Sequence, residues 1–307
     1  MENYLSFAPH IKKKTSANKM YLTILLSLVP AFIAGSIFFG FRSILILLVS
    51  VASVVGSEIA FNFCKFKKFV FNDYSTILVG VLIALVMPPK IPILYPVVGA
   101  VLSNILVKNC MGGVGRSIVN EVAFAKIITF VVFSNTAGCY MISETGAQTS
   151  MTLLGSVISG AETNENMLTI LLGGGTGAVG ENAILFLLIG GIVLCVMQLV
   201  DFKISLFYLL STLVMSLICF GSSDALILLM SGGVVLCAFY LLTDYACAPK
   251  TLLGKLIYGI SAGLVTVLYW KFGKAPDLGA FYAVLIVGIV ANAIKGIYRP
   301  RIVGEKR

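Results

Sequence analysis

Charged side chains are scarce in this chain of 307 residues, of which 11% are charged and 59% are hydrophobic. A soluble domain has about 25% charged and about 45–50% apolar residues, so this composition cannot cover a globule with a water-facing surface. The shortage excludes the soluble enzyme classes and indicates a protein with several membrane spans. Histidine is almost missing as well, because His10 is the only one. A catalytic triad built on histidine is therefore excluded within this chain.

Cysteine occurs seven times but never as a C-x-x-C pair. This spacing predicts neither a zinc site nor an iron–sulfur cluster held by this chain alone, and haem lacks its usual ligands. If the protein carries out redox chemistry, organic carriers such as flavins remain. The balance of 22 Lys and Arg over 13 Asp and Glu contains no basic cluster with interleaved aromatics, so we expect no nucleic-acid partner.

Ten apolar windows meet or approach the length of about 20 residues that a bilayer core requires. The expected fold class is therefore an all-α integral membrane protein with about ten transmembrane helices. The windows lie at residues 20–41, 43–63, 73–88, 91–107, 122–142, 182–200, 203–220, 224–243, 255–273 and 278–297.

The order of these windows divides the chain into two five-helix halves around one long loop. We expect a tail at 1–19, a first half at 20–142, a loop at 143–181, a second half at 182–297 and a tail at 298–307. Transport proteins often have such halves as inverted repeats, although no clear sequence repeat is visible here.

The distribution of basic residues predicts the orientation of the chain in the membrane. With the N-terminus inside, 17 of the 22 Lys and Arg fall in cytoplasmic segments, four fall outside, and Lys126 lies within a span. By the positive-inside rule, both termini are predicted to be cytoplasmic. The polar first 19 residues favour a retained anchor over a cleaved leader.

The long loop at 143–181 has no Lys or Arg and four Glu, and this topology places it outside. Its apolar stretches, Met151–Val157 and Met167–Leu172, are expected to pack on the protein. The sequence from Gly175 to Gly180 fits G-x-G-x-x-G, which indicates a dinucleotide fold only in a soluble strand–helix unit. Two other interpretations stay open, namely a nest of backbone N–H groups that binds an anion and a flexible hinge.

Acidic residues at membrane depth are the other candidates for function, because a lone charge near the bilayer centre costs about 2.5–3.5 kcal/mol on insertion scales. Glu58 and Glu121 are candidates for ion or cofactor contacts, or alternatively are neutral, hydrogen-bonded carboxyls. Lys126 is expected to pair with one of them.

Five short motifs, in order, resemble the D subunit of Rnf complexes and, more distantly, the B subunit of the sodium-pumping NADH:quinone reductase. The first is Ser6-Phe-Ala-Pro9-His10, and the second runs from Asp73 and Ser75 to Pro88-Pro89. The remaining motifs are Gly115-Arg-Ser-Ile-Val-Asn120, Gly177-Ala-Val-Gly180-Glu181, and Ser231-Gly232-Gly233 through Thr243-Asp244.

The resemblance implies a covalent FMN, joined through its phosphate to a threonine in a Ser/Thr-Gly-Ala-Thr motif on the outer side. Here Thr145-Gly-Ala is followed by Gln148, which has no hydroxyl for the phosphoester. Thr149 is the first choice for the attachment, Thr145 the second and Thr152 the third. The glycine segment with Gly177, Gly180 and Glu181 is predicted to stabilise the phosphate.

The resemblance also implies a second, non-covalent flavin, riboflavin or another FMN, nearer the cytoplasmic half. Asp73, Asn120, Gly232 and Gly233 are candidates because they match family motifs. The implied function is electron relay in an ion-translocating ferredoxin:NAD oxidoreductase that moves Na⁺ or H⁺. The implied partners are membrane lipid and the Rnf subunits A, B, C, E and G, with ferredoxin and NAD bound by other subunits. The rival interpretation is a solute channel or carrier without a redox cofactor.

Overall fold

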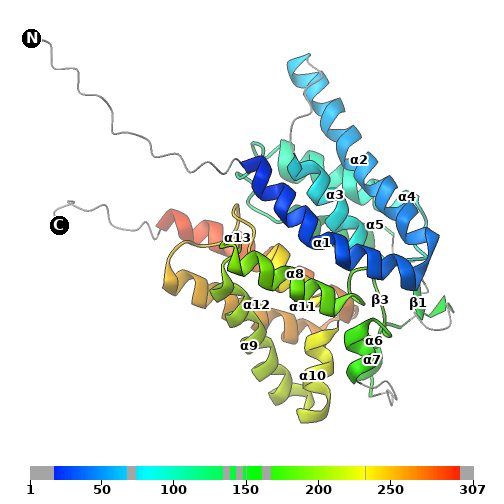
Figure 1. Cartoon of the computed structure of the whole chain (residues 1–307). Helices are drawn as coiled ribbons and strands as arrows, with labels where there is room; N and C mark the ends of the chain where they lie inside the picture. The colour runs from blue at the N-terminus through cyan, green and yellow to red at the C-terminus, as the bar shows by residue number, and fades with distance from the viewer. Residues whose placement is uncertain are drawn as a thin grey trace, which may run out of the picture.

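The computed structural model describes residues 17–67, 74–133, 139–142, 148–149, 151–160, 167–231 and 233–297. Within these ranges the protein is an all-α membrane protein with one small sheet (Figure 1). The elements before the sheet are α1 (Ala17–Phe39), α2 (Phe41–Phe66), α3 (Tyr74–Val86), α4 (Leu94–Ser103), the π-helix η1 (Asn104–Asn109) and α5 (Glu121–Val132). The central segment holds β1 (Tyr140–Ile142), β2 (Gln148–Thr149), α6 (Leu153–Ile158), α7 (Met167–Leu172) and β3 (Thr176–Gly177). The elements that follow are α8 (Ile184–Val196), α9 (Phe202–Phe220), α10 (Ser222–Met230), α11 (Val234–Leu236), the π-helix η2 (Cys237–Leu241), α12 (Leu252–Phe272), the 3-10 helix η3 (Pro276–Leu278) and α13 (Gly279–Ile297).

Each of the ten predicted windows contains a helix, but the helices differ in length. Among the described residues, α1, α2, α9 and α12 are long and apolar enough to cross a membrane, and the bent pair of α10 with α11–η2 raises the number to five at most. Helices α3 and α8 have 13 residues each. At 1.5 Å per residue, such a helix covers about 20 Å of a hydrocarbon core of about 30 Å. The ten spans therefore stay a prediction.

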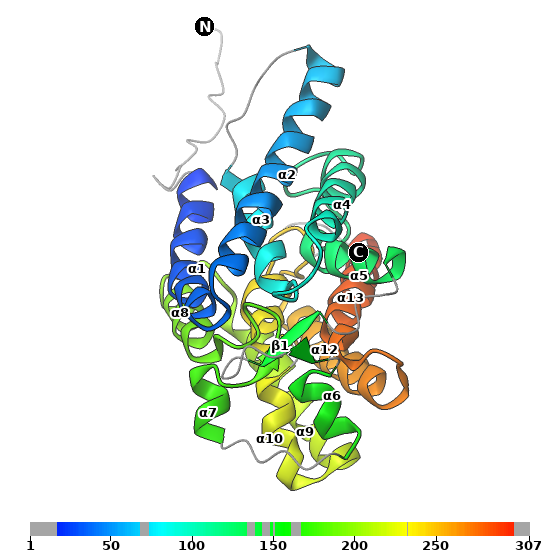
Figure 2. The ribbon, with the colours of Figure 1, turned by 90° about the vertical axis from the view of Figure 1, so that its right-hand side faces the viewer.

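The two halves contact each other through helices that have the same rank in each half, the first with the first and the fifth with the fifth. Helix α1 packs beside α8, and α5 packs against α13. In Figure 2, α1 to α4 occupy the upper part of the molecule, and α9 and α10 the lower part. This pairing is the one that two related halves would give, whereas the inverted repeat itself stays a prediction.

Two predicted helices were wrong in part. The window at 122–142 is helical only to Val132, and its last three residues form β1. The window at 224–243 is not one helix, because α10 ends at Met230 and α11 begins at Val234. Gly233, at the break, has a φ of 70°. That left-handed conformation is nearly free of steric cost only for glycine, so the residue permits the bend.

The end of α3 lies inside the protein, where water cannot satisfy its last carbonyl groups. Two prolines follow Met87 and stop the helix. The carbonyl oxygens are instead bonded by the N–H groups of Val179 and Gly180, which donate to Met87 and Leu85, and by Lys126 Nζ, which donates to Val86. The segment between β3 and α8 is thus the cap of α3.

The long loop is largely structured where it is described. Its sheet has the order β2-β1-β3, with Tyr140 opposite Thr149 and Met141 opposite Gly177. The apolar stretches pack as expected, since α6 contacts α10 and α7 contacts α8. Leu154 and Ile170 are part of the buried core.

Candidate functional site

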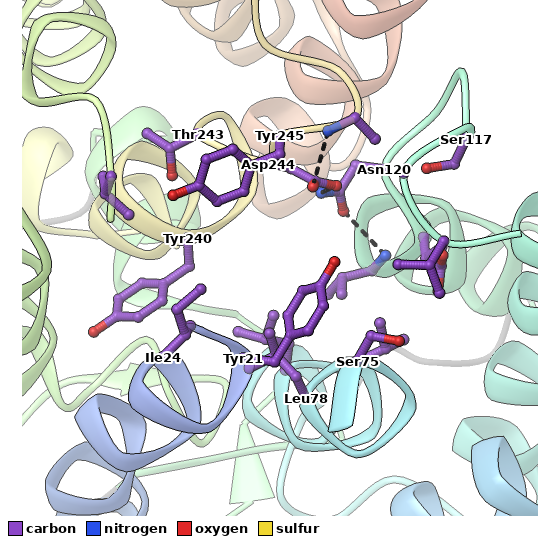
Figure 3. Close-up of a pocket in the computed structure, with 18 of the residues that line it drawn as sticks. Tyr21, Ile24, Ser75, Leu78, Ser117, Asn120, Tyr240, Thr243, Asp244 and Tyr245 are labelled. Atoms are coloured by element: carbon purple, nitrogen blue, oxygen red, sulfur yellow. Dashed lines mark hydrogen bonds between the residues drawn. The ribbon is translucent and has the colours of Figure 1, made fainter. Parts of the chain in front are cut away.

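Polar side chains gather at two places, on opposite ends of α3. The first place, here called the tyrosine cavity, has a volume of about 100 Å³ and lies where α1, α3 and α5 begin. Its lining includes Tyr21, Ser75, Asn120, Glu121, Phe239, Tyr240, Thr243, Asp244 and Tyr245. Figure 3 shows Tyr21, Ser75, Asn120 and Tyr240 around this space. The cavity brings together residues from three of the five sequence motifs.

Asn120 is the N-cap of α5 and uses all of its hydrogen-bonding groups within the chain. Its Oδ1 accepts from the N–H groups of Val122 and Ala123 at 3.0 and 3.1 Å. Its Nδ2 donates to Leu241 O at 3.2 Å and to Asp244 Oδ2 at 3.4 Å. An amide has two donors and two acceptor lone pairs, so none is left over for a ligand. Asn120 therefore shapes the wall of the cavity, and its predicted direct contact with a flavin stays a prediction.

Two other atoms that line the cavity have unused hydrogen-bonding capacity. Ser75 Oγ and Glu121 Oε2 are buried and have no hydrogen-bond partner among the described residues. An orphaned buried polar atom is costly unless a ligand or water completes it. The tyrosine rings and Phe239 add flat apolar surface. Together they offer hydrogen-bonding atoms and flat apolar surface to an aromatic ligand, and the present space of about 100 Å³ corresponds to a single ring.

Glu58 does not pair with Lys126, which corrects the predicted ion pair. Its Oε1 lies 3.4 Å from Lys108 Nζ, and its Oε2 accepts from Asn109 Nδ2 at 3.2 Å. Lys108 also donates to Thr76 Oγ1 at 2.7 Å. Lys126 lies five residues beyond Glu121 in α5, about 7.5 Å further along the axis, and therefore reaches the other end of α3. Glu121 forms no ion pair among the described residues, so this alternative is wrong as well.

The second place is the lysine cluster, which consists of Lys126, Glu181, Asp277 and Thr152. All but Asp277 are 5% exposed or less. The Lys126 ammonium lies over the rings of Phe130 and Phe281, at 4.9 and 5.5 Å from their centroids, and Glu181 and Asp277 are the charged groups that act on it. Thr152 donates to Asp277 Oδ1 and accepts from Gly155 N, so that it also caps α6.

The lysine cluster holds the strand that carries the predicted attachment residue. Thr149 lies in β2, and its Oγ1 bonds the backbone N–H and carbonyl of Met151 at 3.2 Å each. Three residues later, Thr152 fixes the chain to Asp277. Burial raises the pKa of Tyr140, opposite Thr149, well above its usual range, so this phenol stays neutral. Thr152 is buried with its hydroxyl engaged, which argues against the third choice of attachment.

Three predicted site residues lie outside the described residues, namely Asp73, Thr145 and Gly232. Gly233 is described, and a Cβ added there would lie 3.3 Å from Glu181 Oε1. The break between α10 and α11 therefore approaches the lysine cluster and not the tyrosine cavity.

Three N–H groups of the predicted anion nest are already used within the chain, so the nest itself stays a prediction. Val179 and Gly180 donate to α3, and Ala178 N donates to Glu181 Oε2 at 3.0 Å. The acceptor of the Ala178 N–H group is thus a carboxylate of the same loop, that of Glu181. A Cβ on Gly180 would lie 2.8 Å from Leu85 Cβ, so close packing explains this glycine. A flavin contact of Gly177, Gly180 or Glu181 stays a prediction.

Sequence reasoning missed Lys108 and Asp277. The predicted topology places Lys108 in a cytoplasmic segment, although the residue directly follows an apolar run and is 2% exposed. Asp277 directly precedes the last apolar window, and the sequence analysis attached no expectation to it. The only sequence feature that could have marked Lys108 and Asp277 is their position beside an apolar run. This feature does not predict which residue each of them contacts.

A family model described as the NQR2, RnfD, RnfE family matches residues 4–304. The chain is 30% identical over 304 residues to the D subunit of the Na(+)-translocating ferredoxin:NAD(+) oxidoreductase complex of Acetobacterium woodii, with 98% of this chain and 95% of the relative covered. It is 26% identical over 321 residues to the D subunit of the proton-translocating ferredoxin:NAD(+) oxidoreductase complex of Clostridium ljungdahlii, with 99% and 96% covered. The D subunit of the ion-translocating oxidoreductase complex of Methanosarcina acetivorans is 26% identical over 287 residues, with 94% and 92% covered. Since the family model matches almost the whole length, the chain belongs to the NQR2, RnfD, RnfE family.

Proposed function

We propose that this protein is the membrane subunit of an ion-translocating ferredoxin:NAD⁺ oxidoreductase and relays electrons through two flavins. The observation that carries the proposal is the full-length similarity to relatives named as the D subunit of such complexes. The two polar sites add to it, because they lie at opposite ends of α3. Ser75 and Val86 are 11 residues apart in that helix, which corresponds to roughly 17 Å along its axis.

Thr149 is our choice for the covalent FMN. Its hydroxyl is half-buried on a short strand and bonds only neighbouring backbone, so a transferase can reach it after a local rearrangement. The pairing of Thr149 with Tyr140 of the neighbouring strand β1, and the bond of Thr152 to Asp277, would hold the flavin at a constant place. A phosphodiester is costly in hydrocarbon and tolerated at a wet surface, which agrees with the predicted outer location of the loop.

The tyrosine cavity is our choice for the non-covalent flavin. A bound flavin would supply one- and two-electron transfer there. Ser75 Oγ and Glu121 Oε2 would bond the polar edge of the ring, since both lack a partner among the described residues. Asn120 and Asp244 fix the start of α5 against the end of η2 and so keep the walls in place. Tyr21 and Tyr240 would exclude water from the ring.

Ferredoxin and NAD would bind other subunits, because the described elements form no soluble domain that could hold them. The partners we propose are the Rnf subunits A, B, C, E and G together with lipid. The ion moved is Na⁺ or H⁺. We place the protein in the bacterial plasma membrane, as the family resemblance implies, with both termini inside, as the basic residues favour.

The test is the fluorescence of the denatured protein in a gel under ultraviolet light, after expression with its flavin transferase. A covalent flavin stays with the band, and Thr149→Ala abolishes the signal while Thr149→Ser retains it. Fluorescence that persists in Thr149→Ala rejects this attachment residue. A native protein without fluorescence and without extractable flavin would favour the rival function, a channel or carrier.

A further inference from the structure

A second, small cavity lies beside the lysine cluster, between β3 and the break of α10 and α11. Its volume of about 10 Å³ is room for roughly one water-sized occupant. Four of its lining side chains carry oxygen, namely Thr176, Glu181, Asn182 and Ser231. The other lining residues are apolar or glycine. The space is thus an oxygen-lined pocket in an apolar setting.

Glu181 supplies an oxygen that the fold leaves unused. The residue is 5% exposed, and its Oε1 has no hydrogen-bond partner among the described residues, whereas Oε2 accepts from Ala178 N. A buried carboxylate oxygen without a partner is costly, so a positively charged occupant is the natural complement.

The neighbouring oxygens are oriented as acceptors. Asn182 donates its Nδ2 to Gly175 O, which leaves Oδ1 as an acceptor. The Ser231 hydroxyl donates to Leu228 O at 3.2 Å, so its lone pairs remain. Ser231 also ends α10, where the partial negative charge of a helix C-terminus is located. Hard cations prefer such oxygen ligands, and broken helices supply them in ion-coupled transporters.

Charge balance selects a monovalent ion. With all three groups ionised, the lysine cluster carries one ammonium, from Lys126, and two carboxylates, from Glu181 and Asp277, which are the charged groups that act on that ammonium. One further positive charge makes the lysine cluster neutral, whereas a divalent ion would leave it with a net charge of plus one. Among the described residues no three Asp, Glu, His or Cys side chains are grouped as a divalent or transition metal would require.

We propose that this cavity binds one sodium ion, with Glu181 Oε1 as its anionic ligand and Asn182, Ser231 and Thr176 as neutral ones. The site follows from the oxygens of this chain, while its role as a station for the transported ion rests on the proposed function. It is separate from the tyrosine cavity, which lies at the other end of α3.

Carbodiimide labelling of the purified complex tests the site directly. A water-insoluble carbodiimide adds to a buried protonated carboxyl as an N-acylurea, without a leaving group, and peptide mass spectrometry locates the adduct. At constant pH and ionic strength, replacing choline by sodium should slow labelling of Glu181 at least fivefold. The choline sample at the same pH is the control for the intrinsic reactivity of Glu181. Equal labelling of Glu181 in sodium and choline, with a dependence on pH alone, overturns the sodium site in favour of a proton site.

Variants give a second measurement on the same complex. Sodium should raise the thermal stability of the native complex. Glu181→Gln should raise, at least tenfold, the sodium concentration that gives half of this stabilisation. Ser231→Ala should raise it about threefold, and it serves as the readout if Glu181→Gln fails to assemble. Asp201→Asn, an exposed change that breaks only the pair with Lys255, is the matched control and should leave the value unchanged. An unchanged half-saturation in both cavity variants refutes the proposal.

Flavin content, measured in parallel, separates the two proposals. If the complex retains its flavins but sodium has no effect on the labelling of Glu181, the sodium site is refuted and the proposed function stands. If the complex lacks flavin but sodium protects Glu181 from labelling, the proposed function is refuted and the sodium site stands.

Discussion

Replacing Asn120 tests whether the wall of the tyrosine cavity is held by one amide. Asn120→Ala removes the cap of α5, which costs about 1 kcal/mol. It also removes the bonds to Leu241 and Asp244. Such side-chain bonds average about 0.6 kcal/mol in membrane proteins. The free energy of unfolding should therefore fall by about 2 kcal/mol. Asn120→Ser keeps a capping oxygen and loses both donors, so it should cost about 1 kcal/mol.

The assay is unfolding of the purified protein in mixed micelles of detergent and SDS, followed by the fluorescence of Trp270, the only tryptophan of the chain. Asn120→Asp is the matched charge control, because it keeps the cap but places a carboxylate against Asp244, and it should be less stable than Asn120→Ser. The reasoning is refuted if Asn120→Ala and Asn120→Ser lose the same free energy. A loss below about 0.5 kcal/mol in Asn120→Ala would also contradict it.

Three further changes test other parts of the fold by the same unfolding assay. Gly180→Ala should destabilise the protein, because the new Cβ would lie 2.8 Å from Leu85 Cβ. Gly56→Ala, in an open stretch of helix α2, should stabilise it by up to about 1 kcal/mol. A Gly180→Ala protein that is more stable than the Gly56→Ala protein would contradict the packing argument. Lys126→Met should cost about 3–5 kcal/mol, since it leaves the buried carboxylates without their ammonium, and a cost below about 1 kcal/mol would show that the lysine cluster is not electrostatically coupled. Thr152→Val should lower stability and increase protease cleavage near β2, while Thr152→Ser should behave as the native protein; equal cleavage in both variants would argue against the tether to Asp277.

The sequence predicted the helical segments well, because runs of apolar residues need no partner to be recognised. It also predicted that Met151–Val157 and Met167–Leu172 pack on the protein, as α6 and α7 do. The end of the fifth helix was wrong, since 140–142 is as apolar as a helix end but pairs with β2 and β3. Hydropathy measures only the preference for an apolar setting, and strand pairing at that place depends on residues far along the chain.

The sequence by itself determined that this protein belongs in a membrane, because its composition leaves too few charges to face water. It also determined the family, through short motifs that follow one another in a fixed order. The tertiary structure alone decided which charges act on one another, since Glu58 and Lys108, or Lys126 and Glu181, are at least 50 residues apart in the chain. It also decided that the glycine segment caps α3. Both facts depend on where the ends of short helices come to lie, and no local pattern of residues encodes that.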